Sequence, residues 1–217
     1  MKPRMKLHNI TFLILVALVY LLGCNSPYSQ KKTGYFHIDF PQKEYQPFNE
    51  PGYPYTFEYP VYAKVTKDSS YFDSDNPYWI NITFPQFDGK IYISYKDIGG
   101  RSTYKVKGTD GKYRDSTAQN DFYKMVNDAY NMSFKNDIKA YSIEDSIMQT
   151  PNGLGGVFFS LSGNVATAQQ FFLSDTTKHF LRGALYFNVT PNEDSLMPVD
   201  RFLLADMKHI INSLKWK

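Results

Sequence analysis

Histidine, serine and carboxylate side chains are the groups in this sequence whose chemistry would support catalysis or metal binding. Beyond the first 23 residues the histidines are His37, His179 and His209, and none forms a short-spaced pair with another histidine or a cysteine. Structural and catalytic zinc sites usually contain such pairs, so this spacing does not favour one. The G-x-S-x-G elbow of a serine nucleophile is also missing from the sequence. We therefore predict no catalytic residue, no metal site and no cofactor.

Two further charged groups leave a choice of interpretation. Asp73 and Asp75 alternate with polar residues as in some calcium loops, but the glycine and glutamate of an EF-hand loop are missing, which favours a solvated turn. Arg182 stands in the middle of an apolar stretch, so its guanidinium needs a partner. An ion pair with a neighbouring carboxylate is the favoured interpretation, and a binding role is the alternative.

Cys24 is the one residue whose surroundings indicate a defined chemistry. The chain opens with Lys2, Arg4 and Lys6 and continues with a largely apolar run of 13 residues, 10–22. This run is too short to span a membrane, which takes about 20 residues, but it suits the apolar region of a secretory signal. The run ends in Leu-Leu-Gly-Cys, which resembles the lipobox of bacterial lipoproteins. We therefore predict cleavage before Cys24 and attachment of lipid to its sulfur.

Removal of this signal changes the charge balance and defines the domains. Three of the 24 Lys and Arg residues lie in the signal, which leaves 21 basic residues against 21 acidic ones. A neutral chain gives no reason to expect a nucleic-acid partner. We predict a lipoprotein signal peptide at 1–23, a lipidated tether at 24–34 and a single α+β domain at 35–217, with residues 35–55 extended and packed on that domain.

Hydrophobic periodicity predicts strands that are joined largely by hairpins, and two amphipathic helices. The predicted strands are 55–65, 78–84, 90–95, 138–149, 154–162, 168–175 and 179–190. Residues 99–115 are polar and glycine-containing, so a loop is expected there. The predicted helices are 116–134, with Ser116 and Gln119 as a capping box, and 198–214, with Asp194 or Ser195 as its cap.

This order of elements predicts an α+β fold with a mostly antiparallel sheet and two long helices. The last predicted strand, 179–190, is apolar on both faces, so we expect a central strand that is covered on both sides. The result is an α/β/α sandwich similar to that of PsbP-like proteins, and the comparison concerns the fold alone.

Several segments carry a resemblance to a known family. They are Ile38-Asp39-Phe40-Pro41, Tyr53 to Pro60, Trp79-Ile80-Asn81-Ile82, Gly163-Asn164-Val165-Ala166, Gln170-Phe171-Phe172-Leu173, His179 to Phe187 and Pro191 to Leu196. In this order after a lipobox, they resemble the gliding-motility lipoprotein family GldD of the Bacteroidetes, over nearly the whole chain after Cys24.

The resemblance implies a lipid-anchored cell-envelope protein that is required for gliding motility and linked to type IX secretion. It implies other gliding and secretion proteins as partners, besides the membrane reached through the lipid, and it supplies no catalytic residue. Residues 25–32 contain no acidic residue, which favours a periplasm-facing protein at the outer membrane, with the inner membrane as the alternative. The oligomeric state is left open.

Three functions from different classes remain possible at this point. The first is a non-enzymatic interaction component of the motility and secretion assembly. The second is a periplasmic glycan- or peptidoglycan-binding module that uses exposed tyrosines and Trp79. The third is a hydrolase without a recognisable motif. An aromatic groove would favour the second, and clustered acidic or histidine side chains would favour the third.

Overall fold

A computed structural model describes residues 37–68, 76–135 and 138–217, and the main folded unit begins at Ile38. Its elements are β1 (Tyr45–Phe48), β2 (Tyr55–Pro60), β3 (Lys64–Lys67), β4 (Ile80–Phe84), the 3-10 turn η1 (Pro85–Phe87), β5 (Gly89–Asp97), β6 (Arg101–Lys107), β7 (Tyr113–Gln119), α2 (Phe122–Phe134), β8 (Ala140–Gln149), β9 (Gly155–Gly163), β10 (Gln169–Ser174), β11 (His179–Phe187), α3 (Glu193–Ser213) and β12 (Lys215–Trp216). None of the helices in these three ranges is long and apolar enough to cross a membrane.

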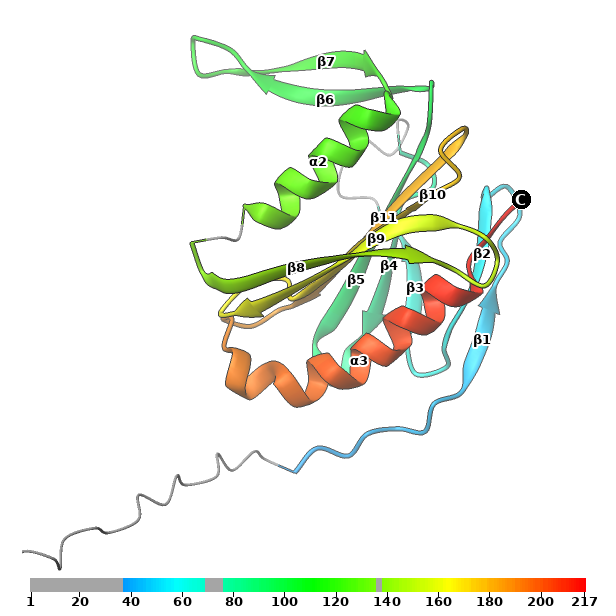
Figure 1. The fold of residues 1–217 in the computed structure, drawn as a ribbon, viewed down its shortest axis with the longest axis vertical. Helices are drawn as coiled ribbons and strands as arrows, with labels where there is room; N and C mark the ends of the chain where they lie inside the picture. Colours follow the sequence, from blue (N-terminus) through cyan, green and yellow to red (C-terminus); the bar gives the residue numbers. More distant parts are fainter. Residues whose placement is uncertain (1–36, 69–75, 136–137) are drawn as a thin grey trace, which may run out of the picture. The chain divides into compact units, whose positions relative to one another are not determined.

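Seven strands form one antiparallel sheet in the order β3-β4-β5-β11-β10-β9-β8. The structure joins the predicted strands 78–84 and 90–95 as the hairpin of β4 and β5 through η1, where Asp88 takes the left-handed conformation at φ 47°. The four strands predicted after the first helix are confirmed as β8 to β11. The mostly antiparallel α+β class is therefore correct (Figure 1).

Alternation along the central strand β11 directs side chains to a helix on each face of the sheet. Leu181 and Leu185 are fully buried in the cluster that contains α3, whereas Phe180 belongs to the cluster that contains α2. Figure 1 shows α2 and α3 separated by the strands. The predicted α/β/α layering is correct. The predicted cover on both faces of β11 is correct for most of the strand, although Arg182 and Tyr186, on the α2 face, stay partly exposed.

Each helix packs through the apolar stripe that its sequence predicts. In α3 the buried apolar residues are Leu203, Met207, Ile210 and Ile211, and in α2 they are Met125 and Ala129. A fully buried leucine or methionine contributes about 1.5–3 kcal/mol through the hydrophobic effect. The α3 stripe therefore holds this helix on the sheet.

The helix starts differ from the predicted ones. Helix α2 begins at Phe122, and its cap is Asp121, whose carboxylate accepts a hydrogen bond from Lys124 N at 2.8 Å. Ser116 lies instead in β7, so the predicted capping box does not form. Helix α3 begins at Glu193 with Asn192 as its cap, so Pro198 lies inside the helix rather than in its first turn.

The polar segment 99–115 was wrongly predicted to be a loop. It contains β6 and the first part of β7, which pair antiparallel as a separate two-stranded sheet. In β6 only Ser102 is buried, so no apolar alternation marked the strand. The β6–β7 hairpin is therefore held by backbone hydrogen bonds, and neither of its faces is buried to any large extent.

The predicted single strand 55–65 is in fact two strands in different sheets. Pro60 ends β2, a turn follows in which Ala63 N donates to Pro60 O at 2.9 Å, and β3 then joins the edge of the large sheet. Strand β2 is the middle of a small sheet β1-β2-β12. Phe48 and Tyr53 pack into the α3-side core, which confirms that the described part of 35–55 lies on the domain.

Candidate functional site

The predicted lipid-attachment residue, Cys24, lies outside the described residues, and so do Asp73 and Asp75. Lipid attachment at Cys24 therefore stays a prediction. Within the described ranges, no group of three or more histidine, cysteine, aspartate or glutamate side chains is arranged to hold a metal ion.

His179 belongs to a buried chain of hydrogen bonds. Tyr95 donates its hydroxyl proton to Asp97 Oδ1 at 2.7 Å, and His179 Nδ1 lies 2.6 Å from the same hydroxyl oxygen. Because a phenol has only one proton, Nδ1–H of His179 donates to Tyr95. Trp216 stacks on the imidazole with centroids 4.9 Å apart, and burial lowers the pKa of His179. This arrangement ties β11, β5 and the C-terminal strand together.

His209 has a structural partner of a different kind. Its ring stacks on Tyr45 with centroids 3.5 Å apart, and its Nε2 lies 2.7 Å from Glu58 Oε2. These contacts join α3 to β1 and β2. Neither His179 nor His209 belongs to a metal-ligand group in the described residues.

Asp206 was not singled out by sequence reasoning, yet it is the most enclosed charged group in the described chain. The residue is fully buried, and its Oδ1 accepts hydrogen bonds from Lys43 Nζ at 2.7 Å and from Tyr45 OH at 3.0 Å. Its Oδ2 accepts from Tyr62 OH at 2.5 Å. Both carboxylate oxygens are thus satisfied, as a buried anion requires.

The Asp206 network fastens the chain that enters the domain onto α3. Lys43 Nζ also donates to the Phe202 carbonyl at 2.7 Å and lies 3.5 Å from the centroid of the Phe202 ring. Burial, together with the charge of Asp206, raises the pKa of Tyr45 and of Tyr62. The one sequence signal was an acidic residue within the apolar stripe of a helix; its partner Lys43 lies 163 residues away in the chain.

Trp79 does not form the exposed platform on which the glycan-binding alternative relied. Its Nε1 donates to Tyr95 O at 2.9 Å, and its ring packs against the α3-side core. The residue therefore works as part of the fold. Any aromatic platform has to come from other side chains.

A groove on the α2 face of the sheet collects aromatic and basic side chains, and we call it the Arg182 groove. It is a hollow of ≈ 750 Å³ with the following lining: Thr83, Asp88, Gly89, Lys90, Tyr92, Arg182, Ala184, Tyr186, Phe187 and Asn188. Tyr92 and Tyr186 meet edge to face with centroids 5.5 Å apart. Lys90 Nζ lies 5.1 Å from the centroid of the Tyr92 ring.

The partner of Arg182 is an amide and not the expected carboxylate. Its Nη2 donates to Oε1 of Gln170, which also accepts from Ser133 Oγ at 3.2 Å. No carboxylate lies within ion-pair distance of this guanidinium among the described residues. Burial lowers the pKa of Arg182, although an arginine stays charged at neutral pH.

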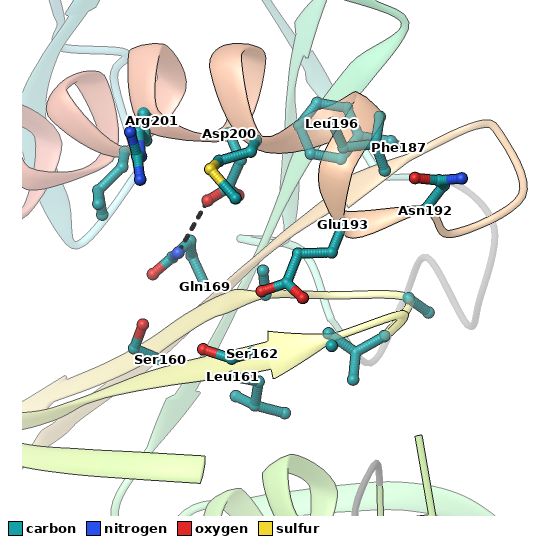
Figure 2. Close-up of a pocket in the computed structure, with 16 residues that line it drawn as sticks. Ser160, Leu161, Ser162, Gln169, Phe187, Asn192, Glu193, Leu196, Asp200 and Arg201 are labelled. Carbon is teal, nitrogen blue, oxygen red and sulfur yellow. Dashed lines mark hydrogen bonds between the residues drawn. The ribbon is translucent and has the colours of Figure 1, made fainter. Parts of the chain in front are cut away.

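A second hollow, the α3 pocket, lies where β9 and β10 face the first half of α3 (Figure 2). Its volume is ≈ 290 Å³. Gln169 Nε2 donates to Asp200 Oδ2 at 2.9 Å, while Gln169 Oε1 and Asp200 Oδ1 are buried with no hydrogen-bond partner among the described residues. Burial raises the pKa of Asp200. Two such oxygens favour a molecule that donates hydrogen bonds.

Comparisons with known proteins identify the family of this chain. A search of curated proteins finds no match. Among solved structures, the chain is similar to the solution structure of cyanobacterial PsbP (CyanoP) from Synechocystis sp. PCC 6803, with a TM-score of 0.43, 10% identity, and coverage of 82% of this chain and 95% of the other. A family model described as gliding motility lipoprotein GldD matches residues 25–216. The chain therefore belongs to the GldD family of gliding motility lipoproteins.

Proposed function

We propose that this protein is a lipid-anchored component of the cell envelope that serves gliding motility by binding other envelope proteins, without catalysing a reaction. The observation that carries the proposal is the family match, which spans residues 25–216. Cys24 directly precedes the matched region and supplies the attachment point for the lipid.

The geometry of the described residues supports a binding role over catalysis. The buried side chains of His179 and Asp206 have their hydrogen-bonding groups engaged within the fold, the first with Tyr95 and the second with Lys43. Catalysis would need a base within hydrogen-bond reach of a nucleophile in a cleft, whereas Asp200, which has a free oxygen in the α3 pocket, is hydrogen-bonded to the amide of Gln169. Arg182 and Asp200, which do face hollows, are suited to holding a ligand.

We further propose a link to type IX secretion, with proteins of the gliding and secretion machinery as partners. The domain would face the periplasm, with the outer membrane as the favoured site of anchorage and the inner membrane as the alternative. These points rest on the family resemblance and on the absence of acidic residues in 25–32. On this proposal, partners should be sought among proteins of the periplasm and its membranes.

The test is covalent capture of partners in living cells. Cells that express the tagged full chain from its own locus are treated with a membrane-permeable crosslinker, and the products are purified and identified by mass spectrometry. An unrelated tagged lipoprotein of the same membrane is the control. We expect gliding or type IX secretion proteins specifically with this chain. Identical capture by both lipoproteins contradicts the proposal.

A second candidate function is a glycan-binding module of the periplasm. The observation that favours it is the Arg182 groove, where Tyr92 and Tyr186 are presented beside two cations. Partner capture and glycan binding are separable, because the first is measured in cells by crosslinking and the second with the purified protein.

A further inference from the structure

The Arg182 groove exists because α2 covers only part of its face of the sheet. Along β5, Lys96 lines a pocket beneath α2 together with Met125, whereas Tyr92, on the same face four residues earlier, is 41% exposed. On the neighbouring strand Phe180 packs in the α2 cluster, but Tyr186 does not. The uncovered half of the face is therefore open to a ligand.

Arg182 is the unusual group in this opening. Arg182 is largely buried, and this desolvation lowers its pKa. Its hydrogen-bond partner in the described chain is the neutral side-chain amide of Gln170. A guanidinium has five N–H donors in a fixed fork that matches a carboxylate, and a buried cation without a counter-charge costs stability. An anionic group bound in the groove would supply that counter-charge.

The other side chains of the groove favour a sugar over a peptide. Tyr92 and Tyr186 present aromatic surface, and Thr83, Asp88 and Asn188 offer groups that hydrogen-bond to hydroxyls. The strands beneath, β4, β5 and β11, are all interior strands of the sheet, so their backbone groups are already paired. A peptide could not add to them as an extra strand, which removes the main-chain hydrogen bonds of that mode of recognition.

We propose that the Arg182 groove binds an acidic glycan, with a carboxylate of the sugar on Arg182 and the sugar rings against Tyr92 and Tyr186. Lys90 lies beside Tyr92 and adds a second positive charge. The proposal deepens the glycan-binding candidate, which rests on the same groove. The glycan is bound in addition to the protein contacts of the motility role, so failure of this proposal leaves the protein-binding function standing.

The test uses the full lipidated protein, purified in detergent, and isothermal titration calorimetry. The probes are an oligogalacturonate, its fully methyl-esterified form and a peptide-free glycan strand that contains muramic acid. We expect both acidic glycans to bind, with affinity that falls as salt rises, and the neutral ester to bind at least about tenfold more weakly. Equal binding of acid and ester overturns the proposal, and so does failure of both acidic glycans to bind.

Variants then assign the binding to the groove. Arg182→Gln and Tyr92→Ala should each weaken binding of the acidic glycan by about tenfold or more. Arg101→Gln removes the same charge from an exposed position in β6 and is the matched control. Tyr92 is exposed, so its variant keeps the fold and remains informative if Arg182→Gln is unstable. Unchanged binding in Tyr92→Ala, or tighter binding of oligoglutamate than of either acidic glycan, overturns the proposal.

Discussion

Asp206 shows how a single buried carboxylate holds a chain segment in place. It accepts hydrogen bonds from Lys43, Tyr45 and Tyr62 while fully buried itself. Breaking a buried, hydrogen-bonded ion pair costs about 3–5 kcal/mol, and the partial exposure of Lys43 moderates this to about 2–4 kcal/mol. We expect Asp206→Ala to lower the free energy of unfolding by that amount, as measured by urea denaturation. The free energy of unfolding of Asp206→Asn, which keeps one acceptor oxygen, should lie between those of the wild type and Asp206→Ala. An unchanged denaturation midpoint in Asp206→Ala would contradict this role of Asp206.

Arg182 is expected to behave in the opposite way. A buried cation without a carboxylate partner is often less stable than an apolar side chain of similar length. We therefore expect Arg182→Met to raise the free energy of unfolding by about 1 kcal/mol, because Gln170 Oε1 retains the hydrogen bond from Ser133. Thermal unfolding without ligand measures this. If Arg182→Met instead lowers the free energy of unfolding by more than about 1 kcal/mol, Arg182 stabilises the fold.

Asp200 makes stability depend on pH in a direction that follows from its burial. Desolvation raises the pKa of this carboxyl above its ordinary value of 3.8, so the folded state binds the proton more tightly than the unfolded chain does. Stability is therefore lost as pH rises from the unfolded pKa through the folded pKa. We expect Asp200→Asn to be more stable than the wild type at pH 7, with a difference that shrinks as pH falls towards 4. Asp194→Asn, an exposed change in the same helix, is the matched control, and a constant difference across pH contradicts the assignment.

Strand and helix positions were predictable wherever one face of the element is buried. β9 alternates buried and partly exposed residues, β10 and β11 are apolar runs, and α3 carries an apolar stripe; the structure has all four elements where these patterns predict them. The hairpin of β6 and β7 carries no such pattern because both of its faces are largely exposed. Helix starts were missed because polar caps such as Asp121 and Asn192 resemble many other polar residues nearby.

The candidate site was predictable only in part. Arg182 stood out because a charged residue in an apolar strand needs a partner, but its partner Gln170 and the neighbours Tyr92 and Lys90 lie on other strands. Which residues meet across a sheet depends on register, and a single sequence does not fix the register of distant strands. Asp206 and Lys43 were missed because one lies in a helix and the other in the chain before β1, and segments 163 residues apart meet only through tertiary packing.

The packing of α3 against the sheet can be tested with two adjacent leucines. Leu203 is fully buried, whereas Leu204 is partly exposed beside the α3 pocket. A buried Leu→Ala change costs about 2–5 kcal/mol, through lost burial and the cavity that it leaves. We expect Leu203→Ala to fall in that range and Leu204→Ala to cost clearly less, as measured by urea denaturation. Equal losses would show that α3 presents a different face to the sheet.

We propose that a lipid on Cys24 anchors a binding domain to the membrane. A single acyl chain holds a protein only marginally, whereas two or more give stable attachment. Cys24→Ser removes the lipid-bearing sulfur and no disulfide, because this is the only cysteine in the chain. We expect an unchanged domain that is neither lipidated nor cleaved by the lipoprotein route. Intact-mass measurement of the protein from its native host checks this, and a lipidated Cys24→Ser protein contradicts the assignment.

We propose that the domain works in motility only while it is anchored to the membrane. The direct measurement is the gliding speed of single cells whose only copy of the protein has residues 1–24 replaced by a cleavable signal without a lipid site. Immunoblotting of periplasmic fractions first confirms that the soluble domain is present at normal abundance, and cells with the full chain are the reference. We expect gliding to be lost in the cells with the soluble domain. Gliding at the reference speed by those cells would contradict it.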